Sequence, residues 1–249
     1  MKIVSSTFFR ALQKIERIAN FAQGKGYGTA SIREEVKLVF SFFKTTPVLA
    51  IDIGGNIGNY TDELRRKNPK LEIHTFEPSA TNIEKLKTKF INDHLVNLVP
   101  LAVSNETGQA VLFSDEPGSG LGSLTKRKLD HFNINFDTTE SIKTIRFEDY
   151  WVNQLNSREI DLVKIDIEGH ELSALQGFGN AIDSIKVIQF EFGGCNIDTR
   201  TFFQDFWYFF NEHNFDIYRI TPFGAEPILK YREIEEYFST TNYIAVRRF

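Results

Sequence analysis

The chain has 249 residues, a length that fits one large domain or two small ones. Apolar residues make up 41% and charged residues 25% of the sequence, which excludes a disordered tail, a collagen-like fibre and a disulfide-stapled miniprotein. There are 29 Lys and Arg against 33 Asp and Glu, and the net charge of −4 argues against a nucleic-acid binder, which usually has a basic surplus. Because Cys195 is the single cysteine, no intrachain disulfide can form, and we expect a reducing, cytoplasmic location.

The N-terminal part of the chain predicts two helices. Apolar residues recur at helical spacing over residues 5–22, with Arg10, Lys14 and Arg17 between them. We expect this helix to pack on the rest of the molecule; the alternative is an interfacial helix whose basic residues face anionic lipid. A second helix is expected over 31–44. The sequence contains no run of about 18 apolar residues that could span a bilayer as a helix.

Beyond Pro47, apolar stretches of strand length alternate with helical segments. The expected strands are 48–54, 71–77, 95–103, 160–167, 184–192, 215–220 and 242–248. The main expected helices are a segment that ends near Lys67, 80–90 and 201–213. This alternation predicts a doubly wound α/β fold with a mostly parallel sheet and helices on both faces. The two C-terminal strands are expected to form an antiparallel edge.

An insertion over residues 104–147 interrupts this alternation. Short extra strands are expected at 111–113 and 142–151, on either side of a stretch rich in Gly and Ser. Such a stretch between two sheet strands predicts a flap that faces the substrate. We therefore expect one domain over 47–249, preceded by a helical extension over 1–46.

The first sheet strand ends in Asp52 and runs into a glycine-rich turn that closes at Gly58. Ligands of doubly wound folds bind at the carboxyl ends of strands. The dinucleotide fingerprint needs Gly at its first, third and sixth positions, which here hold Gly54, Asn56 and Asn59, so a nicotinamide-dependent oxidoreductase is disfavoured. A carboxylate before the turn would repel a pyrophosphate but suits a ligand with an ammonium and a sulfonium. S-adenosylmethionine carries both and has no phosphate.

The second sheet strand ends at Glu77. An acidic residue about 20 positions beyond a glycine turn holds ribose hydroxyls in nucleotide-binding folds. The alternative is that Asp52 and Glu77 only cap helices or face solvent. Because both follow apolar strands of the same predicted sheet, we favour a cofactor site.

A third group of polar residues follows the strand over 160–167. Asp166 and Glu168 point the same way if the strand persists, because side chains alternate along it. Glu168 and Glu171 can share a face once a helix begins. The alternative is that acidic residues here only stabilise a helix N-terminus, and for Glu171 it weighs as much as a functional role.

At these positions the sequence resembles the FkbM family of methyltransferases. The motifs that carry the resemblance lie at 51–61, 74–79, 97–108, 122–124 and 162–177. The turn has GGN at 54–56 where GAN is common in the family, and residues 1–46 lie outside the resemblance. The resemblance implies a Rossmann-like class I fold, S-adenosylmethionine as methyl donor, and a hydroxyl of a sugar, glycan or secondary metabolite as acceptor.

Carried over by position, the resemblance also implies the site. The expected cofactor-binding residues are Asp52, Gly54, Asn56 and Gly58 around the methionine portion, Glu77 on the ribose, Ser104, and Asp166 near the reacting methyl group. Transfer to a hydroxyl calls for a general base, and the candidates are His170, Asp166 and then Glu168. Asp166 with Glu191 could ligate Mg²⁺, but we predict no metal, and Glu191 is expected to line the substrate cleft.

Other features bear on partners. Aromatic residues crowd 202–210, where we expect core packing and a contact between subunits of a homo-oligomer; the alternative is stacking on the faces of a sugar or nucleobase. The basic residues 126–128 are expected to be solvated, with an acidic substrate or lipid carrier as the alternative. The expected partner is a small-molecule or glycan acceptor, with no nucleic acid, and the N-terminal helix allows peripheral membrane contact. A non-catalytic binding module on the same scaffold is the competing function.

Overall fold

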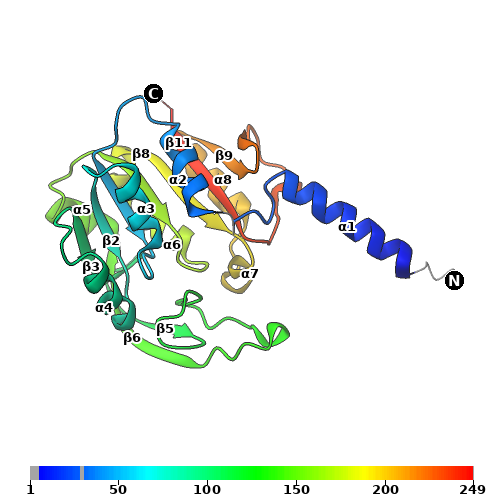
Figure 1. The fold of residues 1–249 in the computed structure, drawn as a ribbon, viewed down its shortest axis with the longest axis horizontal. Helices are drawn as coiled ribbons and strands as arrows, with labels where there is room; N and C mark the ends of the chain where they lie inside the picture. The colour runs from blue at the N-terminus through cyan, green and yellow to red at the C-terminus, as the bar shows by residue number, and fades with distance from the viewer. Residues whose placement is uncertain (1–5, 29–30, 249) are drawn as a thin grey trace.

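An eight-stranded sheet forms the centre of this computed structural model, in which residues 6–28 and 31–248 are described (Figure 1). The strand order is β10-β9-β11-β8-β7-β1-β2-β3. The strands are β1 (Leu49–Ile53), β2 (Glu72–Phe76), β3 (Val96–Val99), β7 (Ile160–Ile165), β8 (Ile185–Phe192), β9 (Phe215–Thr221), β10 (Gly224–Pro227) and β11 (Thr241–Arg247). From β3 to β8 all neighbours pair in parallel, which confirms the doubly wound sheet.

The C-terminal side of the sheet is antiparallel, as expected. β11 lies between β8 and β9 and runs antiparallel to both, while β10 forms the outer edge. The last strand of the chain is therefore an inner strand, buried over most of its length.

Helices cover both faces of the sheet (Figure 1). They are α2 (Ile32–Phe40), α3 (Asn59–Lys67), α4 (Ala80–Lys89), α5 (Phe147–Asn153), α6 (Glu171–Gln176), α7 (Cys195–Thr199) and α8 (Phe203–Glu212). Every residue of β1 and β7 is buried, because alternate side chains point into two separate apolar clusters. Phe203, Phe206 and Phe210 of α8 are fully buried, which confirms core packing for the aromatic stretch, while a subunit contact stays a prediction.

Two expected strands have different bounds in the structure. The stretch 95–103 is split into β3 and a short strand β4 (Ala102–Ser104), because Pro100 has no N–H to continue the ladder. β4 belongs to a second sheet, in the order β4-β6-β5, with β5 (Gly108–Ser114) and β6 (Thr138–Arg146). The expected strand over 142–151 is therefore partly wrong, since its second half forms α5.

The first helix, α1 (Ser6–Ala22), has the expected bounds but not the expected packing. It projects from the body of the molecule (Figure 1), and Ile15 and Ile18 are 63% and 70% exposed. The prediction that it packs on the main domain is wrong. Gly24 and Gly26, both at positive φ, redirect the chain directly after the helix. Among the described residues, no helix is both long and apolar enough to cross a membrane.

Candidate active site

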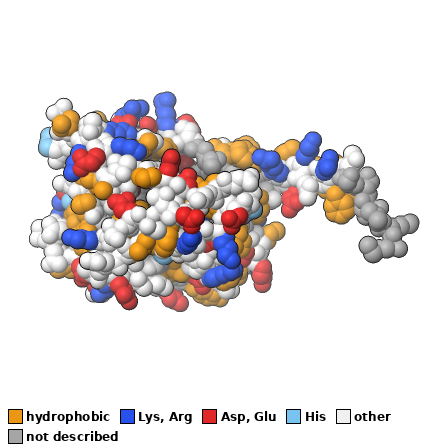
Figure 2. All heavy atoms as spheres, turned by 90° about the horizontal axis from the view of Figure 1, so that it is seen from below, with side chains coloured by type: hydrophobic (Ala, Val, Ile, Leu, Met, Phe, Trp, Pro, Cys, Tyr) orange, Lys and Arg blue, Asp and Glu red, His pale blue; other side chains and the backbone are white. Residues whose placement is uncertain are grey.

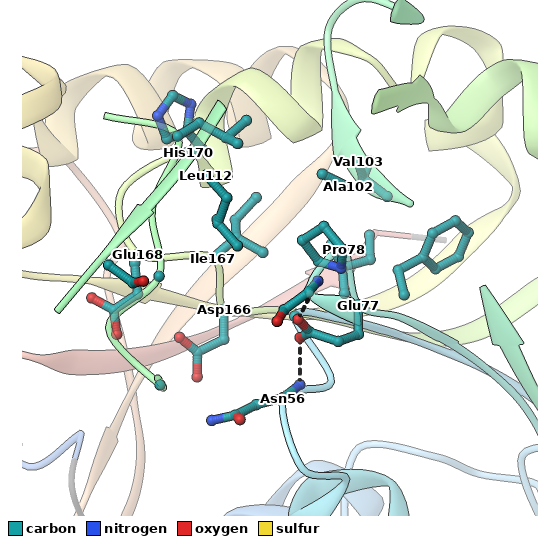
Figure 3. A pocket seen from close by; sticks show the side chains of 18 of the residues that line it. Asn56, Glu77, Pro78, Ala102, Val103, Leu112, Asp166, Ile167, Glu168 and His170 are labelled. Carbon is teal, nitrogen blue, oxygen red and sulfur yellow. Dashed lines mark hydrogen bonds between the residues drawn. The ribbon is translucent and has the colours of Figure 1, made fainter. Parts of the chain in front are cut away.

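A cavity opens at the carboxyl ends of β1, β2, β7 and β8 (Figure 3). The space enclosed by its lining, together with the open solvent at its mouth, is about 990 Å³. The insertion supplies one wall, with Leu112 from β5, Gly120 from the following loop and Glu140 from β6. The insertion thus lies where a flap facing a ligand is expected.

Glu77, directly after β2, is held at the cavity by backbone groups. Its Oε2 accepts a hydrogen bond from the backbone N–H of Asn56 at 2.8 Å, and its Oε1 accepts one from the N–H of Ser79 at 2.9 Å (Figure 3). The residue is only 6% exposed, and burial raises its pKa. Because each carboxylate oxygen has further lone pairs, Glu77 can still accept hydrogen bonds from a ligand.

Gly54 begins the turn after β1 and also lines the cavity. Its φ is +88°, and a Cβ added there would lie 1.9 Å from the backbone oxygen of Asp166. Only glycine allows this close approach between the ends of β1 and β7.

The β1–β2 end of the cavity fits S-adenosylmethionine. The buried Ser79 hydroxyl lines the cavity and has no hydrogen-bond partner among the described residues, so it can bond a ligand. Glu77 offers a carboxylate suited to ribose hydroxyls. Apolar lining suited to an adenine ring comes from Phe76, Pro78, Leu101, Val103 and Leu112.

Three residues expected at the cofactor do not line the cavity, so their predicted contacts are not supported. Asp52 is 1% exposed and accepts a hydrogen bond from the Thr61 hydroxyl at 2.6 Å, because its side chain points between the sheet and α3. Gly58 directly precedes α3, and a Cβ there would collide with the ring of Phe90. Ser104 ends β4, where its hydroxyl contacts Asn105 and Ser173.

Three carboxylates form a cluster at the β7–β8 end of the cavity. Oxygens of Asp166, Glu168 and Glu191 lie within 4.8 Å of one another. β7 ends at Ile165, so the expected strand does not persist through Glu168. Glu168 instead has a left-handed backbone with φ of 53°, and this strained turn brings its side chain back toward Asp166.

The three base candidates predicted from the sequence all line the cavity, and each has a partner. Asp166 accepts a hydrogen bond from Lys164 at 2.8 Å, and Glu168 accepts one from Arg127 at 2.6 Å. His170 Nε2 lies 2.9 Å from the Thr125 hydroxyl, and burial lowers the pKa of this imidazole. Burial and the charge of Asp166 raise the pKa of Glu168 to about 7.

Glu191 differs from the other two carboxylates of the cluster. It lies near the end of β8, lines the cavity and is 8% exposed. No described residue makes a hydrogen bond or ion pair with its side chain. Burial, followed by the charges of Asp166 and Glu168, raises its pKa well above the ordinary value. The sequence signal is the same as for Glu77, an acid near the end of an apolar strand, and Glu191 lines the cavity as the sequence predicts.

The insertion is fastened to the turn that follows β7. The Ser123 hydroxyl donates a hydrogen bond to the backbone oxygen of Glu168 at 2.7 Å, next to the contacts made by Thr125 and Arg127. The Arg127 side chain is only 10% exposed. The prediction that the whole basic stretch 126–128 is solvated is therefore wrong for Arg127, because its partner comes from a distant strand end.

Glu171 has a structural position. It is fully buried and begins α6, so it does not share a helical face with Glu168. Its Oε1 accepts hydrogen bonds from the backbone N–H groups of Ile167 and Gly169, at 3.0 and 3.1 Å. Burial raises its pKa to about 7.

The spacing of the three clustered carboxylates is one that a divalent cation could bridge. Lys164 and Arg127, however, already supply positive charge to two of the three. The cluster is therefore better suited to binding a proton than to binding a metal ion.

Comparison with known proteins agrees with this arrangement. A 2-O-methyltransferase, NoeI, from Sinorhizobium fredii is 24% identical over 187 residues, which are 71% of this chain and 76% of that one. The hexuronic acid methyltransferase AglP from Haloferax volcanii is 26% identical over 142 residues, 55% of this chain and 52% of that one. The chain thus spans about half of the length of AglP.

The fold also has a solved counterpart. A proposed rRNA methylase from Clostridium thermocellum superposes with a TM-score of 0.51 at 10% identity, over 89% of this chain and 97% of that one. Residues 52–217, more than half of the chain, match the methyltransferase FkbM domain. The resemblance seen in the sequence is confirmed: the chain belongs to the FkbM family of methyltransferases, and S-adenosylmethionine is its methyl donor.

Proposed function

We propose that this enzyme methylates a hydroxyl group of a sugar or glycan acceptor and that Glu191 is its general base. The observation that carries the proposal is a buried carboxylate without a partner, beside a cavity that suits the methyl donor. The names of two relatives, a 2-O-methyltransferase and a hexuronic acid methyltransferase, support hydroxyl and carbohydrate chemistry.

The residues of the β1–β2 end hold the cofactor in this proposal. Glu77 accepts the ribose hydroxyls, while Gly54 and Asn56 form the turn beside it. Asp166, a member of the carboxylate cluster, lies between Glu168 and Glu77 in Figure 3. S-adenosylmethionine supplies a methyl group that is activated by a positively charged sulfur.

The residues of the β7–β8 end take up the acceptor's proton. A sugar hydroxyl is a weak nucleophile until its proton begins to leave, so a base within hydrogen-bond reach is required. Lys164 and Arg127 each bond an oxygen of Asp166 and Glu168, so these two carboxylates are already engaged by cations. Glu191 has no cation bonded to it among the described residues, and the attraction of Lys164 is outweighed by burial and by the charges of Asp166 and Glu168, so it is the carboxylate of the cluster that most readily binds a proton.

Two further proposals concern the cellular location and the oligomeric state. Cys195, the single cysteine, is buried and cannot form an intrachain disulfide, which supports a cytoplasmic location. A homo-oligomer stays a prediction, supported by exposed aromatic residues of α8 and the residue before it, Tyr208 and Phe202.

Calorimetric titration with S-adenosylmethionine and S-adenosylhomocysteine tests the cofactor site. We expect micromolar binding to the wild type and at least ten-fold weaker binding, about 1.4 kcal/mol, to Glu77→Ala. Glu84→Ala, which changes an exposed acid of α4, is the matched control and should bind as the wild type does. If a folded wild type binds neither ligand, the assigned cofactor site is wrong.

The acceptor is tested separately, by mass spectrometry of free sugars, glycosides and uronic acids incubated with enzyme and cofactor. A gain of one methyl group on a hydroxyl of any of these supports the proposal. Tight cofactor binding without transfer to any hydroxyl compound would favour the non-catalytic binding module instead.

A further inference from the structure

The helix α1 is the part of the molecule that the proposed chemistry does not use. It stands clear of the body, and every side chain from residue 7 to residue 19 is exposed (Figures 1 and 2). Hydrophobic and basic side chains are both visible along this projecting arm in Figure 2.

The side chains of α1 are sorted onto two faces. At about 100° per residue, one face collects four of the six larger apolar side chains, Phe8, Leu12, Ile15 and Ile18, of which the least exposed is still 44% exposed. Phe9 lies beside this face, and Phe21, near the base of the helix, lies on the other face with its ring against that of Tyr27. The opposite face carries the basic residues Arg10, Lys14 and Arg17. Glu16 is the only acidic residue of the helix, so α1 has net positive charge in a chain whose total is −4.

An uncovered helix of this kind needs a partner. A 17-residue helix is marginally stable alone in water. α1 also has no acidic residue in its first turn and no basic residue in its last turn, so the helix dipole is not compensated. The surface that stabilises it must cover the apolar face and suit the basic one.

A paired helix from a second copy suits α1 poorly. The residues at the spacing of a coiled-coil seam span little more than two heptads, and Ala19 and Ala22 fill the last two seam positions. Positions beside the seam hold Phe9 and Ile18, where a coiled coil needs charge pairs. The basic residues would then face only water.

An anionic bilayer suits both faces. Phe, Leu and Ile side chains on one face of a basic helix are typical of helices that lie in the membrane interface. Long Arg and Lys side chains can reach back to the headgroups, where they are attracted by the anionic phosphates. Two further exposed apolar side chains, Phe223 and Ile234, 86% and 64% exposed, belong to segments that contact the base of the helix.

The base of the helix is fixed to the body. The Arg219 side chain donates a hydrogen bond to the backbone oxygen of Gln23 at 2.7 Å, and Lys25 donates one to the oxygen of Ile234 at 2.8 Å. We propose that α1 binds the surface of an anionic lipid bilayer through its apolar face and thereby holds the enzyme at the membrane. This inference does not depend on the acceptor or on the general base.

The test is flotation of the full chain with two kinds of vesicle, pure phosphatidylcholine and an equal mixture of phosphatidylcholine and phosphatidylglycerol. We expect at least ten-fold tighter binding to the mixed vesicles, weakened by added salt. Ile15→Glu should lower that binding at least ten-fold. Ile91→Glu, the same change at a 78% exposed isoleucine of the body, is the matched control and should bind as the wild type does.

Each other result overturns the proposal. Absence of binding to both vesicles excludes a membrane role, and equal binding to both excludes the role of the basic face. Sedimentation of the wild type as a dimer that Ile15→Glu dissociates, without vesicle binding, would assign the apolar face to a second copy. Unchanged titration with S-adenosylmethionine shows that the variants remain folded, because α1 lies outside the cavity.

Discussion

The two ends of the cavity hold their acidic residues in different ways. At the β1–β2 end, Glu77 is fixed by backbone N–H groups of Asn56 and Ser79, 21 and 2 positions away in the chain. At the β7–β8 end, Glu168 is fixed by the Arg127 side chain, 41 positions away, and Glu191 has no partner. The backbone N–H groups that hold Glu77, which we call the backbone cradle, keep its carboxylate in place before a ligand binds, which suits a residue that binds the cofactor. In the carboxylate cluster, Asp166 and Glu168 have cationic partners and Glu191 has none among the described residues, which suits a group that takes up a proton from the acceptor.

The largest expected effect separates the two ends by activity. Glu191→Gln keeps the side-chain shape but removes the base, so we expect kcat to fall about 10²- to 10⁴-fold, while the affinity for S-adenosylmethionine stays within about two-fold. Glu77→Gln is the counterpart and should mainly weaken cofactor binding. Steady-state kinetics together with calorimetry measure both quantities.

The pH dependence sharpens this prediction. Burial and the charge of Asp166 raise the pKa values of both Glu168 and Glu191, so these carboxylates titrate as a coupled group. Because a base must be ionised, wild-type kcat should rise with pH as the cluster loses its proton. The residual activity of Glu191→Gln should lack this rise, and an unchanged profile would remove Glu191 from the mechanism.

The next prediction tests the close approach of Gly54 to the backbone of Asp166, at the β1–β2 end of the cavity. Gly54→Ala places a Cβ 1.9 Å from the oxygen of Asp166 at a φ of +88°, so we expect a loss of about 2–5 kcal/mol in the free energy of unfolding. Gly26→Ala has a similar φ of +75°, but its nearest contact would be 3.5 Å away. It should lose only about 1–2 kcal/mol. Equal losses in denaturant titrations would show that close approach at Gly54 is unimportant.

Arg127→Met tests the distant partner at the other end. The pair is mostly buried, with side chains 10% and 20% exposed, so removing the guanidinium leaves Glu168 uncompensated, together with Asp198, the second carboxylate that Arg127 pairs with. We expect a loss of about 1–3 kcal/mol in unfolding free energy and a further rise in the pKa of Glu168. Lys128→Met, one position further at an exposed residue, should change neither. A similar loss in both variants would mean that the ion pair contributes nothing specific.

The same contrast explains what the sequence could predict. The strands β1, β2, β7 and β8 and the residues Gly54 and Glu77 follow from local patterns, because strand, turn and acid are near neighbours in the chain. The direction of Asp52 depends on which face of the strand meets α3, and the partner of Glu168 lies in an insertion without a pattern of its own. Glu191 was visible as an acid near a strand end, but only packing shows that it is buried without a partner.

The smallest expected effect concerns Glu171, which does not follow the difference between the two ends of the cavity. It lies at the β7–β8 end yet is held by backbone N–H groups, as Glu77 is, and its Oε2 has no partner among the described residues. Burial raises its folded pKa from the ordinary 4.5 to about 7. The folded chain therefore binds this proton more tightly than the unfolded chain. That contribution to stability is complete below pH 4.5 and is lost as pH rises through about 7.

Glu171→Gln preserves the acceptor for both N–H groups and cannot ionise. Its unfolding free energy should therefore improve relative to the wild type as pH rises from about 5 to about 8, by on the order of 1 kcal/mol. Thermal unfolding of both proteins across this range measures the change, with the exposed Glu84→Gln as control. A constant difference between wild type and variant would mean that Glu171 stays ionised in the fold. The backbone cradle alone would then suffice to hold a buried carboxylate charged at either end of the cavity.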